Sequence, residues 1–280
     1  MKIKAILMDI DGTLTNERKE ITPRTRRVLL AAQEQGAKLV LASGRPTQGL
    51  RAIARELQMD KHHGLLVSYN GSAVTDAQTN ETLFSKTIPA DESRAVLEHI
   101  LKFDVRPVVY KGDYLYTNDL SRRMITVDGA PFDVIAYEGK CCCMEIREQR
   151  DLLAFADYPM NKVLTAGNPE YLAAHREEMA APFEGTLNHM FTSPFYLEFT
   201  AKNIDKAEAL DAVLSPLGIF PAEMVAFGDG QNDISMLKYA GLGVAMANAD
   251  EKVKAAADEI TLSNEEDGLA AVLERFFPAE

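Results

Sequence analysis

The sequence predicts an α/β fold: a doubly wound, mostly parallel sheet with helices on both faces, interrupted by an inserted α+β region. Two observations predict the sheet. Apolar segments alternate with helical segments at both ends of the chain, which is typical of βαβ units. These apolar segments are continuous, as expected for parallel strands that are buried on both faces. A third observation predicts the insert, because the regular alternation stops between residues 85 and 197. We therefore expect a larger domain from residues 1–84 and 198–280, and a second domain from 85–197.

The first segment of the larger domain has clear helix boundaries. Thr22 is a suitable N-cap, Pro23 suits the first helical position, and Gly36 suits the end of the same helix. The expected order is a strand over 3–10, this helix, a strand over 37–45, a helix over 47–58, a strand over 64–71 and a hairpin over 72–84.

Helices and strands follow one another in an irregular order in the insert, and their regular alternation returns after residue 203. In the insert we expect helices over 91–102 and 169–179, with strands in "RPVVYKGDYLYTND", "CCCMEIRE" and "MFTSPFYLEFT". After residue 203, helices in "DKAEALDAVLSPLG", "NDISMLKYAG", "DEKVKAAADEI" and "EDGLAAVLERFF" alternate with strands in "EMVAFGDG", "LGVAMANA" and "ITLSN". This second alternation completes the larger domain.

Composition narrows the class of partner. The chain has 280 residues, 46% of them hydrophobic, and a net charge of −12. An acidic chain lacks the basic surface that nucleic-acid binding requires, and no stretch approaches the ~20 apolar residues of a membrane span. A small anionic substrate is still compatible, because a few lysines and helix N-termini bind anions locally. We expect no nucleic-acid or membrane partner, and a monomer or weak homodimer.

The three cysteines form one run, Cys141 to Cys143. Adjacent cysteines do not suit a disulfide framework, and the sequence has no others to pair with them. On the expected strand, Cys141 and Cys143 would share one face, in a buried structural role. The absence of a disulfide framework and of a signal peptide predicts a reducing, cytoplasmic compartment.

Three apolar strands of the larger domain run directly into polar residues. The first ends in "DIDGT" (9–13), the second in "SGR" (43–45) and a later one in "GDGQND" (228–233). Ligands of open α/β sheets bind at the carboxyl ends of the strands. Two carboxylates at ~4 Å repel each other by about 4 kcal/mol at an effective dielectric constant near 20, so a cation is needed to offset the cluster. Hard oxygen ligands without histidine or thiolate favour Mg²⁺.

These motifs resemble those of the haloacid dehalogenase (HAD) superfamily, specifically its Cof-type sugar-phosphatase-like group. "MDIDGTL" resembles the nucleophile motif, "ASGR" the second motif and "FGDGQNDISML" the acidic fourth motif, and "YNGS" and "LSNEEDGLAAVLE" are also similar to this group. The resemblance implies a Rossmann-like core with an inserted cap. The third motif requires a lysine that begins a helix, so Lys206 is favoured, with Ala207 where glycine is usual. Lys202 is the competing candidate.

The resemblance also implies a role for each residue. Asp9 is the expected nucleophile, which forms an aspartyl-phosphate. Asp11 is the expected general acid and base, and residues two apart on a strand face the same way. Mg²⁺ is expected on the Asp9 carboxylate, the Asp11 carbonyl and Asp229, with Asp233 orienting the ligands. The expected phosphate-binding groups are the backbone near Ile10, Ser43, the Gly44 amide, Lys206 and Asn232.

We therefore predict a Mg²⁺-dependent hydrolase of phosphomonoesters of small metabolites, most of all sugar phosphates. The insert over 85–197 is expected to act as a cap that sets substrate specificity, because all four motifs lie outside it. Two alternatives stay open. A phosphomutase would return the phosphoryl group to a sugar, and a regulator would bind a phosphate ligand without turnover.

Overall fold

The computed structural model describes residues 2–278, which form two compact units. The core unit is built from both ends of the chain, up to Phe84 and from Asp205 onward, and the inserted unit spans Ser85–Ile204. The second boundary corrects the prediction that the core resumes at 198. Strand β13 (Tyr196–Ala201) pairs with two strands of the inserted unit, so its residues belong there.

The core unit contains an eight-stranded sheet in the order β16-β15-β14-β1-β2-β3-β4-β5. The central strands pair in parallel, and β3 pairs with β4 in the antiparallel direction. This confirms the predicted α/β class. The strands are β1 (Ala5–Met8), β2 (Lys38–Ala42), β3 (Leu65–Ser68), β4 (Ala73–Asp76), β5 (Thr82–Ser85), β14 (Met224–Gly228), β15 (Leu242–Ala245) and β16 (Glu259–Ile260).

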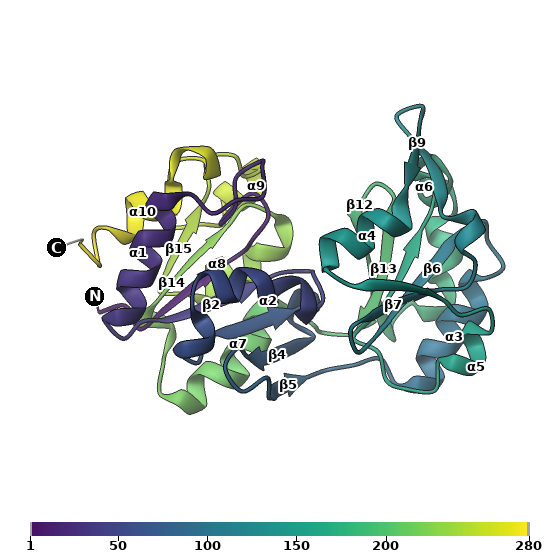
Figure 1. The fold of residues 1–280 in the computed structure, drawn as a ribbon, viewed down its shortest axis with the longest axis horizontal. Helices are drawn as coiled ribbons and strands as arrows, with labels where there is room; N and C mark the ends of the chain where they lie inside the picture. Colours follow the sequence, from purple (N-terminus) through teal and green to yellow (C-terminus); the bar gives the residue numbers. More distant parts are fainter. Residues whose placement is uncertain (1, 279–280) are drawn as a thin grey trace. The chain divides into compact units, whose positions relative to one another are not determined.

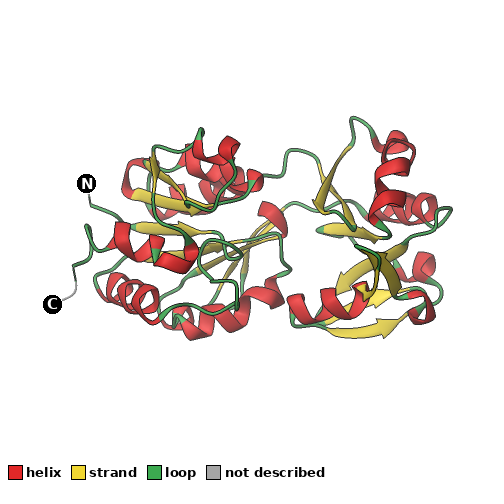
Figure 2. Cartoon of the chain, turned by 90° about the horizontal axis from the view of Figure 1, so that it is seen from above, coloured by secondary structure: helices red, strands yellow, loops and turns green. Residues whose placement is uncertain are grey.

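Each face of this sheet has its own hydrophobic core, because side chains alternate along a strand. In β1, Ile6 and Met8 pack in one cluster, while Ala5 and Leu7 pack in the other. The first cluster takes residues from α1 (Pro23–Glu34), α2 (Thr47–Glu56) and α10 (Gly268–Leu273). The second takes residues from α7 (Lys206–Leu214), α8 (Ile234–Tyr239) and α9 (Glu251–Lys254). Helices therefore cover both faces of the core sheet (Figure 2).

The start of α1 shows how local sequence sets an element. The Thr22 side chain accepts a hydrogen bond from the Thr25 backbone amide, and Pro23 occupies the first turn. This is the predicted cap, in which the side chain satisfies an amide that has no partner within the helix. The chain turns sharply at Gly36, whose φ is +89°. The helix therefore returns the chain to the sheet at β2.

The inserted unit contains a six-stranded mixed sheet in the order β10-β7-β6-β11-β13-β12 and a separate β8–β9 hairpin (Figure 1). Its strands, besides β13, are β6 (Arg106–Lys111), β7 (Tyr114–Thr117), β8 (Met124–Val127), β9 (Ala130–Asp133), β10 (Glu145–Glu148), β11 (Lys162–Ala166) and β12 (Leu187–Ser193). Its helices are α3 (Ala90–Ile100), α4 (Val134–Cys142), α5 (Leu152–Phe155) and α6 (Pro169–Ala180).

The prediction that the cysteine run lies on a strand is wrong. Cys141 and Cys142 end helix α4, and Cys143 follows in the left-handed region with a φ of 54°. The three side chains therefore differ in environment: Cys142 is buried, Cys141 is partly buried and Cys143 is exposed. The Asp133 side chain caps this helix by accepting from the Ala136 amide, which offsets the weak helix propensity of cysteine.

Among the helices of residues 2–278, none combines the length and the apolar character that crossing a membrane requires.

Candidate active site

Three neighbouring parallel strands of the core unit deliver the predicted residues to one edge of the sheet. Asp9 follows β1, Ser43 follows β2 and Asp229 follows β14. Strand β1 pairs in parallel with both β2 and β14, so their carboxyl ends meet at the same edge. The sheet topology thus explains how residues more than 200 positions apart in sequence form one site.

Lys206 joins two of the carboxylates at this edge. It is the first residue of α7 and is fully buried. Its Nζ lies 2.7 Å from Asp9 Oδ1, 2.5 Å from Asp233 Oδ1 and 2.7 Å from the carbonyl oxygen of Ala42. An ammonium group has three protons to donate, and here three acceptors surround it.

Lys202, the competing lysine, lies elsewhere. It belongs to the inserted unit, is exposed, and its Nζ donates to the Gly185 carbonyl oxygen at 2.6 Å. The structure therefore places Lys206, and not Lys202, in contact with the nucleophile candidate Asp9.

Asp9, Asp229 and Asp233 form a cluster suited to a metal ion, since each offers an oxygen within 4.8 Å of the others. Thr13 Oγ1 donates to Asp229 Oδ1 at 2.5 Å and fixes that carboxylate. Gly12 has a φ of +84°, and a Cβ at this position would lie 2.3 Å from Asp229 Oδ2. Glycine is therefore required both by the backbone conformation and by the close approach of the metal-ligand candidate.

The electrostatics of this cluster follow from burial and repulsion. Burial raises the pKa of Asp9 above its ordinary value, and the neighbouring carboxylates raise it further, while Lys206 acts in the opposite direction. Burial also raises the pKa of Asp229, to about 6, against the lowering effect of the Thr13 hydrogen bond. Both shifts show that negative charge is disfavoured at this edge without an added cation.

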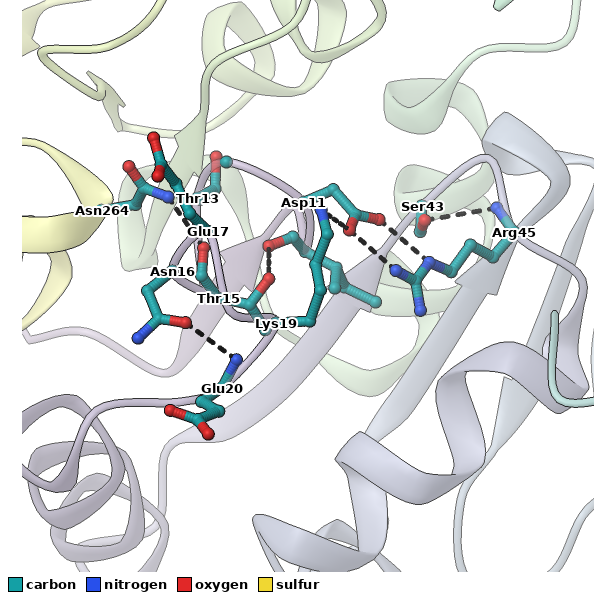
Figure 3. Close-up of polar contacts among 12 residues, drawn as sticks. Asp11, Thr13, Thr15, Asn16, Glu17, Lys19, Glu20, Ser43, Arg45 and Asn264 are labelled. Atoms are coloured by element: carbon teal, nitrogen blue, oxygen red, sulfur yellow. Dashed lines mark hydrogen bonds and ion pairs between the residues drawn. The ribbon is translucent and has the colours of Figure 1, made fainter. Parts of the chain in front are cut away.

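The Asp11 carboxylate contacts two cations, Arg45 and Lys19 (Figure 3). Arg45 grips its carboxylate with two hydrogen bonds, from Nε at 2.9 Å and from Nη2 at 2.7 Å. Lys19 Nζ adds a third contact at 2.8 Å. Burial acts to raise the pKa of Asp11, but Arg45 and Lys19 together lower it below its ordinary value. In this arrangement Asp11 is a carboxylate.

The remaining predicted residues lie around the same edge. Ser43 is buried, and its Oγ accepts a hydrogen bond from the Arg45 amide at 3.2 Å. Ile10 is fully buried, and its carbonyl oxygen accepts from both the amide and the hydroxyl of Thr15. Asn232 is exposed, and its side-chain amide donates to Asn70 Oδ1.

Sequence reasoning missed some residues that contact the site. Arg45 stood in a recognised motif without an assigned role, and Thr13 stood in another. Lys19 gave no signal, because a lysine in a polar loop is ordinary. Asn70 stood in "YNGS", where an asparagine before glycine reads first as a turn residue.

Comparison with known proteins agrees with this geometry. A family model described as haloacid dehalogenase-like hydrolase matches residues 6–273. A solved haloacid dehalogenase-like hydrolase from Bacteroides thetaiotaomicron is 38% identical with a TM-score of 0.89, and the match covers 99% of this chain and 100% of that one.

Two named phosphatases are also similar along nearly their full length. The 5-amino-6-(5-phospho-D-ribitylamino)uracil phosphatase YcsE of Bacillus subtilis is 30% identical, over 97% of this chain and 94% of its own. The sugar phosphatase BT4131, of HAD subclass IIB, is 26% identical with a TM-score of 0.77, over 98% of both chains. Family model, relatives and motifs all give the same assignment: the chain belongs to the haloacid dehalogenase-like hydrolase family.

Proposed function

We propose that the protein is a Mg²⁺-dependent phosphatase that hydrolyses phosphomonoesters of small metabolites, most of all sugar phosphates, through an aspartyl-phosphate on Asp9. The observation that carries this proposal is the fully buried Lys206, which contacts Asp9 and Asp233 beside Asp229. The pairing of Lys206 with Asp9 and Asp233 does not explain why a third carboxylate, Asp229, lies beside them. A phosphoryl group and a metal ion account for the whole set.

The charges of the cluster suit a divalent cation. When all are ionised, three carboxylates and one ammonium group leave a net charge of −2. The donors are hard oxygens, with no histidine or thiolate among them, which favours Mg²⁺. Asp9, the Asp11 carbonyl and Asp229 would hold the ion, and Asp233 would orient them. When bound, Mg²⁺ would offset the charge of the phosphate and its transition state.

In the first proposed step, an Asp9 oxygen forms a bond to phosphorus while the bond from phosphorus to the leaving oxygen breaks. Asp11 gives its proton to that oxygen, so an alcohol departs. In the second step, water attacks phosphorus, Asp11 takes a proton from this water, and the bond to Asp9 breaks to release phosphate. Lys206, Ser43, the Gly44 amide, the backbone near Ile10 and Asn232 hold the phosphoryl oxygens, which is mainly positioning and charge stabilisation.

Asp11 must change partners to perform this role. Its carboxylate is gripped by Arg45 and Lys19, and its pKa is lowered. To protonate a leaving oxygen, the side chain must first exchange these cations for the substrate and take up a proton from solvent. A dianionic phosphate, which competes for the same cations, would favour that exchange.

The substrate class is proposed from the family and from the domain organisation. The named relatives act on a sugar phosphate or on a phosphorylated ribityl compound, so a small phosphorylated metabolite is the natural class. All four motifs lie in the core unit, which holds the phosphoryl group in this proposal. The inserted unit would then determine which leaving groups, and so which substrates, the protein accepts.

The test is phosphate release from a panel of phosphorylated metabolites, measured with Mg²⁺ and after treatment with EDTA. We expect EDTA to stop release and added Mg²⁺ to restore it. Ca²⁺ should restore it poorly, because Ca²⁺ favours longer bonds and higher coordination than Mg²⁺. A full rate in metal-free buffer would contradict the metal proposal. A phosphoryl group that returns to a sugar hydroxyl, with no free phosphate, would identify a mutase.

A further inference from the structure

The turn Tyr69–Gly71, which directly follows β3, has an unusual backbone. Three consecutive residues have a positive φ: 52° at Tyr69, 58° at Asn70 and 103° at Gly71. This region is disfavoured for residues with a side chain, most of all for a bulky one such as tyrosine. Such conformations persist only where surrounding contacts enforce them, and they gather at functional sites.

The turn is fastened to the loop that carries Ser43. The Tyr69 amide donates to the Arg45 carbonyl oxygen, and the Asn70 amide donates to the Ser43 carbonyl oxygen, both at 3.0 Å. The Asn70 side chain also packs on Gly44, where an added Cβ would lie 3.1 Å from Asn70 Nδ2. The turn therefore contacts all three residues of the 43–45 loop.

The same turn also touches the start of α7. A Cβ on Gly71 would lie 2.3 Å from the Asp205 carbonyl oxygen and 3.1 Å from the Lys206 amide nitrogen. Glycine thus lets the turn reach the residue that contacts Asp9 and Asp233. Any side chain at this position would push the turn away from Lys206.

A third contact runs from Asn70 to the loop after β14. Asn232 Nδ2 donates to Asn70 Oδ1 at 3.0 Å. Asn70 is buried, whereas Asn232 is exposed. An exposed amide rotates freely unless it is held, so the buried partner fixes the direction of the exposed one. One of the two amide protons of Asn232 is used, and the other is available to a ligand.

We infer that Asn70 is a positioning residue for the proposed reaction. It fixes the Asn232 amide and the Gly44 backbone in the orientation that receives phosphoryl oxygens, without itself carrying out chemistry. This inference rests on the proposed function, because the groups that Asn70 orients are the proposed phosphate-binding groups. Contacts with three segments of the site distinguish this turn from an ordinary loop.

The test is a double-mutant cycle with Asn70→Gly, Asn232→Ala and both together. Glycine adopts the left-handed backbone without strain, so N70G removes the amide and leaves the turn possible. Asn70→Ser is measured in parallel, because serine is too short to replace the amide and fills more space than glycine. Asn80→Gly is the matched control. Asn80 has a φ of 60° and lies in the exposed turn between β4 and β5.

We expect N70G to lower kcat about tenfold, within the range of coupled residues, while N80G keeps the wild-type value. N232A should lower kcat in the wild-type background but by less than about twofold in N70G, since the amide is already released. N70S should behave as N70G. Equal effects of N232A in both backgrounds, in whichever Asn70 variant folds by circular dichroism, would overturn the inference. So would a wild-type kcat in folded N70G or N70S.

Binding of inorganic phosphate in the presence of Mg²⁺, measured by calorimetry, separates the two proposals. If the wild-type protein binds phosphate but hydrolyses no panel member, the proposed function fails and the Asn70 inference is judged on binding alone. In that case N70G must weaken phosphate binding and N80G must not. Unchanged binding in N70G would overturn the inference even where phosphatase activity is found. A wild-type protein with neither binding nor turnover would overturn both.

Discussion

Replacing Asp9 by asparagine is expected to abolish phosphate release while leaving the fold intact. An amide is a poor nucleophile and a weaker metal ligand than a carboxylate, and loss of a nucleophile costs about 10⁴-fold or more in kcat. The fold should persist because asparagine keeps the shape of aspartate and its amide oxygen can still accept from Lys206. Lys206 also keeps its ion pair with Asp233, so its charge stays paired. The measurement is the initial rate of phosphate release with Mg²⁺, together with the melting temperature in EDTA.

Asp151→Asn is a matched control for this variant. Asp151 caps α5 in the inserted unit, and asparagine is an equally good cap. D151N should retain the wild-type rate. The account would be contradicted if purified, folded D9N kept a substantial fraction of that rate.

Replacing Lys206 by methionine is expected to have the second largest effect. A preorganised donor to a reacting oxygen is worth about 10²–10³ in kcat, and Lys206 also keeps Asp9 and Asp233 from repelling each other. Removing one partner of a buried ion pair costs about 3–5 kcal/mol of stability. Lys206→Met should therefore lower both kcat and the melting temperature, and Mg²⁺ should recover part of the stability but not the rate.

Lys202→Met provides the comparison, because it makes the same substitution at the competing lysine. Lys202 is exposed, and its Nζ donates to the backbone carbonyl oxygen of Gly185. Its loss should change kcat by less than about twofold, as expected for a surface substitution away from the site. If K202M were the more damaging variant, the third motif would have been misplaced.

The fold was predictable where sequence patterns are local. Apolar runs marked β1, β2 and β14, and the carboxyl-end rule for parallel strands then predicted that Asp9 and Asp229 would meet. Prediction failed where tertiary packing decides the outcome. The cysteine run had no periodic pattern of its own, and its helix depends on the Asp133 cap and on packing. The second domain boundary was misplaced because β13 resembles any buried strand until its pairing partners are known.

The candidate site was predictable to the extent that its residues stand in motifs. A motif identifies the residues of a site but not the side chains that they contact. Nothing in the sequence shows that Asp11 pairs with Arg45 and Lys19, or that Asn70 holds an asparagine 162 positions away. These contacts depend on side-chain orientation and on loops that the sheet brings together. They change the chemistry, because Asp11 is held as a carboxylate where the motif alone suggests an acid.

The central claim is that the phosphoryl group is bound covalently to Asp9 during the reaction. The Asp11→Asn variant tests this claim most directly. p-Nitrophenyl phosphate has a leaving group that needs no protonation, so D11N should still form the covalent intermediate but lack the base that removes it. We expect a rapid release of about one p-nitrophenolate per protein, followed by a slow rate, with phosphate found on Asp9 by mass spectrometry after acid quenching. Absence of that burst with no phosphate on the protein, or phosphate on a residue other than Asp9, would contradict the account.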